Sequence, residues 1–201
     1  MSPITDIVAA DEEGIARAAA AVLSGQVVGY PTETLYGLGV DALSQPAVDL
    51  LTRIKGRQGD QPIPVLVDSV EMLERLVASV PPAARVLMAT YWPGPLTLVL
   101  PAASGLPGAV VNERGGVGVR ISSDPIASAL VRQVGRPLTS TSANLAGSPP
   151  ATDAARACLE GVRLVLDGGP RCQQASTVVE VMPGTSPVVL RQGAAVLPGR
   201  S

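Results

Sequence analysis

The 201-residue sequence predicts a mixed α/β (α+β) fold, in which helices surround a twisted, open, mixed sheet. Two observations support this prediction. The composition is 46% hydrophobic and 16% charged, with a mean hydropathy of +0.32, which is typical of a compact globular protein. Short runs rich in valine and leucine also alternate with stretches whose apolar residues have helical spacing. Their irregular order argues against a clean doubly wound parallel sheet.

The predicted helices have start and stop signals. Residues 15–23 are rich in alanine, follow a group of acids and end before Gly25, which is suited to a helix C-terminus. Asp124 is expected to cap a helix over residues 125–134, because Pro125 fits the first helical position. Further helices are predicted over residues 46–54, 69–77 (with Ser69 as its cap), 82–91 and 152–159.

Strands are predicted where short apolar runs are bounded by turn residues such as Pro93, Gly94 and Pro95. These runs are residues 26–30, 64–67, 96–100, 117–121, 137–140, 162–166, 177–181 and 188–190. Between the first two runs, Gly37 and Gly39 favour a turn that needs positive φ. Since we find no repeat and no long linker, we expect residues 1–201 to form one domain.

The sequence contains no histidine, which excludes a Ser-His-Asp triad and most zinc sites. Any catalysis must therefore use carboxylates, lysine, arginine, hydroxyls, backbone amides or the substrate itself, and we expect no dedicated metal site. The net charge of −2 argues against a protein whose main task is to bind nucleic acid.

Two cysteines, Cys158 and Cys172, match no metal-binding or redox spacing and are expected to be reduced thiols. Acidic residues interrupt the N-terminal region, so we expect no signal peptide there. No apolar run reaches about 18 residues, the length that a membrane-spanning helix needs. These features predict a cytoplasmic protein that does not bind membranes.

Polar clusters follow or interrupt several predicted strands, and together they suit a nucleotide and a small carboxylate. Lysine and arginine neutralise phosphate oxygens, and small hydroxyls add neutral donors. Taken singly, each cluster has an ordinary structural interpretation, such as a charged helix C-terminus, a serine-rich turn or a salt-bridged arginine. No P-loop or GxGxxG motif is present. The clusters are residues 30–39, 55–60, 139–144 and 176–177, with Arg120 and Arg191 at strand ends.

Seven short motifs in fixed order carry a resemblance to a known family. They are YPTETLYGLG from Tyr30, KGR from Lys55, WPGPLT from Trp92, VGVR from Val117, STSANLAG from Ser140, STVV from Ser176 and LRQG from Leu190. In this order and over nearly the whole chain, they resemble the YrdC-like threonylcarbamoyl-AMP synthase family.

The resemblance implies an enzyme that joins L-threonine, bicarbonate and ATP into threonylcarbamoyl-AMP and releases pyrophosphate. Partner proteins would then transfer the threonylcarbamoyl group to an adenosine of tRNA, and tRNA itself would be at most a weak partner. The implied structure is a short, single-domain form of the YrdC-like fold with a large, concave, basic cleft. Mg²⁺ would be carried with ATP.

The resemblance also implies roles for individual residues. Threonine would be held by Thr34, Arg120, Ser140 and Ser176. The nucleotide would be held by Lys55, Arg57, Ser142, Asn144 and Arg191, with Lys55 and Arg57 as the catalytic pair that neutralises the phosphates. Thr32 and Glu33 would lie beside the site. Glu33 is expected to orient Lys55 or Arg57, and a catalytic or magnesium-binding role is the alternative. Residues 58–61 are a candidate mobile loop.

Two departures from the family pattern leave alternatives open. Many relatives have a histidine where this chain has Leu66, which cannot form a hydrogen bond with threonine. Many also have a proline and a histidine after the arginine-bearing strand, where this chain reads ISSDP from Ile121 to Pro125. One alternative is therefore a paralogue that makes or uses another carbamoyl-adenylate. The other is a non-catalytic RNA-binding module, against which the net charge and the few aromatic residues argue.

Overall fold

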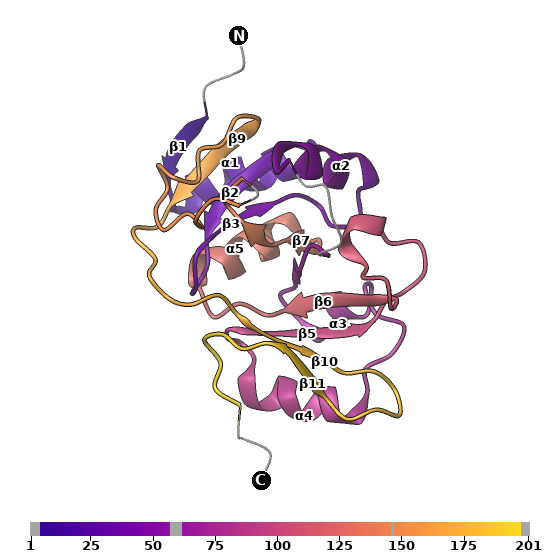
Figure 1. Cartoon of the computed structure of the whole chain (residues 1–201). Coiled ribbons are helices and arrows are strands. Elements are labelled where there is room, and N and C mark those ends of the chain that lie inside the picture. The colour runs from indigo at the N-terminus through magenta and orange to yellow at the C-terminus, as the bar shows by residue number, and fades with distance from the viewer. Residues whose placement is uncertain (1–4, 57–61, 146, 198–201) are drawn as a thin grey trace.

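The computed structural model describes residues 5–56, 62–145 and 147–197. The strands in these ranges form two mixed sheets, with helices packed against them (Figure 1). The mixed α/β class is thus confirmed, but the strands are divided between two sheets where the sequence suggested one. The single domain predicted for residues 1–201 stays a prediction.

The first sheet contains five strands in the order β1-β9-β2-β3-β8. The strands β1, β9 and β2 are parallel, whereas β3 and β8 join as antiparallel neighbours. Two late segments of the chain therefore lie beside early ones, which places β8 next to the β2–β3 hairpin. The bounds are β1 Asp6–Ala9, β2 Val27–Pro31, β3 Tyr36–Gly39, β8 Thr141–Ser142 and β9 Val162–Asp167.

The second sheet contains six strands in the order β11-β10-β5-β6-β4-β7. Two of its neighbouring pairs, β10 with β5 and β4 with β6, are parallel, and the other three pairs are antiparallel. The bounds are β4 Val65–Leu66, β5 Leu96–Pro101, β6 Gly116–Arg120, β7 Leu138–Thr139, β10 Thr177–Glu180 and β11 Val188–Arg191.

The helices cover these sheets. The helix α1 contacts the helix α5 and the strands β2 and β9 of the first sheet (Figure 1). The helix α4 contacts β5 of the second sheet. Within the described ranges, no helix combines the length and the apolar character that crossing a membrane would need. The bounds are α1 Glu12–Leu23, α2 Gln45–Ile54, α3 Val70–Leu73, α4 Pro82–Tyr91, α5 Pro125–Val134 and the short 3-10 helix η1 Gly108–Val110.

Local capping signals predicted helix starts well. Asp124 accepts hydrogen bonds from the backbone N–H groups of Ile126 and Ala127, at 2.9 and 3.1 Å, as expected for the cap of α5. Ser69 likewise accepts from the N–H of Met72, although α3 has only four residues and is much shorter than the predicted 69–77.

The helix predicted over residues 152–159 is wrong, because this segment forms turns. Its backbone groups are engaged elsewhere. The carbonyl of Thr152 accepts from the N–H of Arg171 at 2.7 Å, and the N–H of Arg156 donates to the side chain of Asp153 at 2.9 Å. These contacts replace the hydrogen bond that a first helical turn would form between residues 152 and 156.

The interpretation of Gly37 and Gly39 as a turn with positive φ is also wrong. Both lie in β3, and neither has positive φ. Gly39 is needed for close packing instead, since an added methyl group would lie 2.7 Å from Cε1 of Tyr30 and 2.9 Å from Cγ of Leu138. The missing side chain lets the buried ring of Tyr30 lie against β3.

Candidate active site

The turn between β2 and β3 orders its hydroxyl groups through its own backbone. We call residues 32–35 the hydroxyl turn. The backbone N–H and the hydroxyl of Thr32 both donate to the carbonyl of Leu35, at 3.0 and 2.7 Å. The hydroxyls of Thr32 and Thr34 lie 2.9 Å apart. Both threonines are buried, so these groups are held in one arrangement rather than dispersed in solvent.

Glu33 points from the hydroxyl turn toward the end of β6. Its carboxylate accepts hydrogen bonds from Nη1 of Arg120 and from the hydroxyl of Ser122. The side chains of Arg120 and Glu33 are only 6% and 11% exposed, so the ion pair is largely removed from water. Glu33 thus holds Arg120, where the sequence suggested Lys55 or Arg57 as its partner.

Tyr30 and Ser140 lie beside this ion pair. The phenol of Tyr30 donates to the carbonyl of Thr139 at 2.8 Å. Burial raises the pKa of Tyr30 far above its ordinary value, and this effect outweighs the lowering by Ser140 and by Arg120. Tyr30 is therefore neutral at physiological pH, and its phenol donates to the backbone directly before Ser140.

Ser176 and Arg191 meet where β10 begins. Nη2 of Arg191 donates to the carbonyl of Ser176 at 2.9 Å, and the hydroxyl of Ser176 lies 2.9 Å from that of Thr97. Partial burial lowers the pKa of Arg191, and the positive charge of Arg120 lowers it further. Both guanidinium groups add positive charge to this part of the molecule, which favours an anionic ligand.

Lys55 lies at the C-terminus of α2 and is only 3% exposed. Its ammonium group donates to the carbonyl of Ser142 and to Oδ1 of Asn144, the latter at 3.1 Å. The hydroxyl of Ser142 donates to the same Oδ1 at 2.5 Å. Asn144 therefore joins Lys55 to Ser142, and the nucleotide-binding role that the resemblance implies for these residues stays a prediction. Arg57 and residues 58–61 lie outside the described residues.

The strand β3 connects these two groups of side chains. Gly37 is in register with Ser142, and a methyl group added at Gly37 would lie 3.5 Å from the hydroxyl of Ser140. Because β8 pairs with β3, the fold places Ser142 of the Lys55 group beside the hairpin that carries the hydroxyl turn. The described residues predicted to bind threonine and the nucleotide thus lie at this hairpin and β8, at the end of α2, at the end of β6 and at the start of β10, and their binding roles stay predictions.

Comparison with known proteins gives the family. The model of the Sua5/YciO/YrdC domain, which bears the description "Telomere recombination", matches residues 20–193. The chain belongs to the Sua5/YciO/YrdC family. The resemblance inferred from the ordered motifs is thereby confirmed.

Two similar proteins are both named threonylcarbamoyl-AMP synthase. The threonylcarbamoyl-AMP synthase of Xanthomonas axonopodis pv. citri (strain 306) is 43% identical over 155 residues, which cover 76% of this chain and 82% of that protein. The threonylcarbamoyl-AMP synthase of Bacillus subtilis (strain 168) is 37% identical over 194 residues, which cover 94% of this chain and 56% of that protein. The chain thus spans little more than half the length of the Bacillus enzyme.

Two solved structures of family members are similar to this chain. Pyrococcus abyssi Sua5 complexed with L-threonine gives a TM-score of 0.86 at 36% identity, over 94% of this chain and 57% of that one. Escherichia coli YciO gives a TM-score of 0.84 at 29% identity, over 98% of each chain. The YrdC-like fold is therefore confirmed, and the family contains members both much longer than this chain and of nearly equal length.

Sequence reasoning missed three polar residues that support the site in this family member. Ser122 contacts Glu33, Thr97 contacts Ser176, and Arg171 donates to the backbone of the hydroxyl turn. Thr97 lies within the WPGPLT motif, and Ser122 lies two residues after the VGVR motif. Their positions in or near these motifs could have indicated a role in the site. Arg171 follows the turn DGGP, which gives no local sign of its distant contacts.

Two departures from the family pattern have structural roles here. Leu66 is 1% exposed and lies opposite Arg120 in the β4–β6 register, so it forms an apolar support beside the arginine. Asp124 caps α5 and accepts from Nη2 of Arg171 at 2.9 Å. Both residues that depart from the family pattern therefore have defined packing or hydrogen-bonding roles in this structure.

The acidic groups around the site are already engaged. Both oxygens of Glu33 accept hydrogen bonds, and both oxygens of Asp124 do the same. In the described ranges, no group of three or more His, Cys, Asp or Glu residues could hold a metal ion. The arginine, lysine and hydroxyl donors of these groups suit an anionic ligand.

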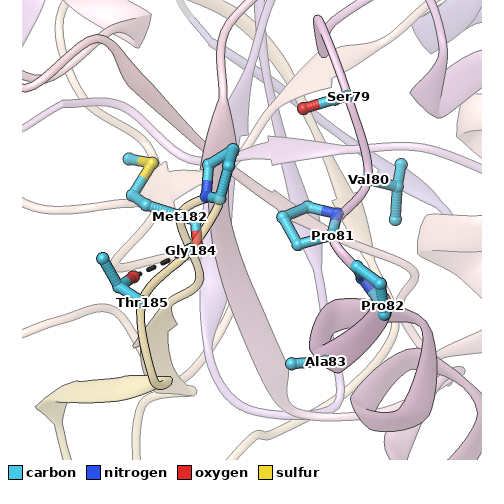
Figure 2. A pocket seen from close by; sticks show the side chains of 9 residues that line it. Ser79, Val80, Pro81, Pro82, Ala83, Met182, Gly184 and Thr185 are labelled. Carbon is cyan, nitrogen blue, oxygen red and sulfur yellow. Dashed lines mark hydrogen bonds between the residues drawn. The ribbon is translucent and has the colours of Figure 1, made fainter.

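A separate cavity of about 350 Å³ lies between the start of α4 and the turn that joins β10 to β11 (Figure 2). Residues 79–83 and 182–185 line it, and most of them are apolar or proline. None of the candidate site residues contributes to this cavity. It is not the large basic cleft that the resemblance implies, and that cleft stays a prediction.

Proposed function

We propose that this chain is an L-threonylcarbamoyladenylate synthase, a nucleotidyltransferase that forms threonylcarbamoyl-AMP and pyrophosphate from L-threonine, bicarbonate and ATP. The observation that carries the proposal is the buried Arg120, which Glu33 holds beside the ordered hydroxyls of residues 32–35. Membership of the Sua5/YciO/YrdC family supports it, as do relatives named threonylcarbamoyl-AMP synthase at 37–43% identity.

In the proposed threonine subsite, Arg120 binds the substrate carboxylate. Arginine carries five N–H donors, and its fork can bind a carboxylate at two points. The hydroxyls of Thr34, Ser140 and Ser176 provide neutral donors and acceptors for the rest of the amino acid. The Pyrococcus abyssi member was solved in complex with L-threonine, which supports L-threonine as a ligand of this chain.

In the proposed nucleotide subsite, Lys55 and Arg57 neutralise the ATP phosphates, with Ser142, Asn144 and Arg191 around them. Lys55 is already fixed by Ser142 and Asn144, so little freedom is lost when a phosphate binds. Mg²⁺ enters with ATP and stays on the phosphates, because the nearby carboxylates are engaged by arginine, serine and backbone groups.

The proposed reaction needs no histidine. The threonine amine and bicarbonate first give N-carboxythreonine with loss of water. One oxygen of this new carboxylate then attacks the α-phosphorus of ATP. The bond from that phosphorus to the bridging oxygen breaks, and pyrophosphate leaves with the electron pair. The side chains contribute positioning and neutralisation of the charge that develops on the phosphates.

We further propose that partner proteins take the product and transfer the threonylcarbamoyl group to tRNA in the cytoplasm. A mixed anhydride between a carbamate and AMP hydrolyses readily, so it requires prompt transfer to an acceptor. The net charge of −2 supports a protein partner more than strong direct binding of tRNA by this chain.

A second candidate function is a related adenylate-forming reaction with another carboxylate. The observation that favours it is Leu66, an apolar residue that lies opposite Arg120 in the β4–β6 register, at the place of a histidine in many relatives. The identity of 37–43% to two relatives named threonylcarbamoyl-AMP synthase argues for the first candidate.

The deciding experiment measures pyrophosphate release from ATP, Mg²⁺ and bicarbonate with each amino acid in turn. Release that depends on L-threonine is the expected result. Release with serine or another acid would favour the second candidate. No release by folded protein would contradict both and leave a binding role. The variant Arg57→Ala extends the test, since it should abolish ATP binding, and tight ATP binding by that variant would contradict the assigned nucleotide subsite.

A further inference from the structure

Arg171 links three segments of the chain through one guanidinium group. Its Nε donates to the carbonyl of Thr32 at 2.9 Å, and its Nη2 donates to Oδ2 of Asp124 at 2.9 Å. Its Nη1 donates to the carbonyls of Gly168, Gly169 and Pro170, at 2.8, 3.2 and 3.2 Å. The side chains of Arg171 and Asp124 are only 17% and 5% exposed, so this ion pair is largely shielded from solvent, unlike a typical surface ion pair.

The carboxylate of Asp124 divides its two oxygens between two tasks. Oδ1 caps α5 by accepting from the N–H groups of Ile126 and Ala127. Oδ2 accepts from Arg171. Asp124 therefore fixes Arg171 to the N-terminus of a ten-residue helix that packs against α1 and β2. A rigid element thus determines where the guanidinium group lies.

The segment between β6 and α5 holds the hydroxyl turn at two points. Ser122 contacts Glu33 directly, and its oxygen also accepts from the N–H of Asp124 at 3.2 Å. Asp124 contacts Thr32 through Arg171. Because Arg120 directly precedes this segment, one stretch of chain positions both the arginine and the hydroxyl turn.

We infer that Arg171 and Asp124 are a positioning pair for the amino acid subsite. This inference rests on the proposed function. The pair holds the carbonyl of Thr32, and with it the hydroxyls of the turn, at a fixed place relative to Arg120. Neither residue touches Lys55, Ser142 or Asn144 in the described hydrogen bonds, so the pair acts on the amino acid and not on the nucleotide.

Two substitutions separate this role from a general loss of structure. Asp124→Asn keeps a good helix cap, but its side chain loses the negative charge that holds Arg171. Arg171→Lys keeps the positive charge but loses the planar fork, so a single ammonium group cannot reach the acceptors on all three segments. Both should raise the KM for L-threonine about tenfold, since small misplacements of binding groups have effects of this order.

Asp41→Asn is the matched control. Asp41 has the same double role elsewhere in the molecule: Oδ1 accepts from the N–H of Leu43 at 2.9 Å, and Oδ2 accepts from Nη1 of Arg136 at 2.8 Å. Its side chain is 7% exposed, close to the 5% of Asp124. Asp41→Asn should leave the KM for threonine unchanged, although it also breaks a half-buried ion pair.

The experiment measures kcat and the KM values for threonine and ATP by pyrophosphate release, with circular dichroism to check folding. A rise in the threonine KM for Asp124→Asn and Arg171→Lys, with the ATP KM within about twofold of wild type, supports the inference. An unchanged threonine KM overturns the inference, and so does an equal rise in KM for threonine and ATP. In both cases the proposed function stands. A wild-type protein without threonine-dependent release overturns the proposed function and this inference with it.

Discussion

Glu33 and Arg120 form a buried ion pair between residues 87 positions apart in the sequence. Among the hydrogen bonds of the described residues, Arg120 uses only Nη1, toward Glu33. A guanidinium group has further N–H donors on Nε and Nη2, which can bind a second carboxylate. The ion pair thus orients the buried arginine without occupying all of its N–H donors.

Replacing Arg120 should affect threonine far more than ATP. Arg120→Lys keeps the charge but loses the fork that binds a carboxylate at two points. We expect the KM for threonine to rise by about 10- to 100-fold, with a much smaller change for ATP. Steady-state pyrophosphate release at varied concentrations of each substrate measures both. Equal losses for the two substrates would show that the pocket is divided differently.

Replacing Glu33 should destabilise the protein. Glu33→Gln leaves the guanidinium group of Arg120 buried without its counter-charge, which should lower the free energy of unfolding by about 2 kcal/mol. Urea denaturation followed by circular dichroism measures the difference. The control is Glu180→Gln, because Glu180 is also buried, at 8% exposure, but its partner Arg114 is 74% exposed and stays hydrated. A cost as large for Glu180→Gln would contradict the argument.

The two glycines of β3 should differ in their tolerance of alanine. Gly39→Ala places a methyl group 2.7 Å from the buried ring of Tyr30 and should lower the free energy of unfolding by about 1–3 kcal/mol. Gly37→Ala meets its nearest neighbours at an ordinary 3.5 Å and should change stability by less than about 1 kcal/mol. Thermal and urea unfolding of the two variants provide the test, and the reverse order would show that β3 packs differently.

The two thiols should differ in reactivity. Cys172 is exposed, whereas Cys158 is half-buried and its thiol donates to the carbonyl of Ala154 at 3.3 Å. Burial raises the pKa of Cys158, so at pH 8 a smaller fraction is the reactive thiolate. Iodoacetamide should therefore modify Cys172 first, as peptide mass spectrometry would show. The labelling rate of Cys158 should rise with pH up to its raised pKa, and equal rates at pH 8 would contradict this prediction.

Local signals in the sequence were sufficient for several elements. The span of α5 was predicted because Asp124 and Pro125 fix a helix start through contacts with the next few residues. The turns at residues 152–159 were not predicted, because the carbonyls of Ala151 and Thr152 bind the N–H groups of Tyr36 and Arg171. A segment whose backbone partners lie far away in the chain has no local pattern that reports them.

The sequence by itself determined which chemistry is available. The absence of histidine, the hydroxyl-rich YPTETLYGLG stretch and the ordered motifs led to the family and to the residue types of the site. The partner of each residue was decided only by the tertiary structure. Glu33 binds Arg120 and not Lys55, Lys55 binds Ser142 and Asn144, and Arg171 reaches back to Thr32. These contacts depend on the order and register in which distant strands pair, which neither hydrophobic periodicity nor local capping specifies.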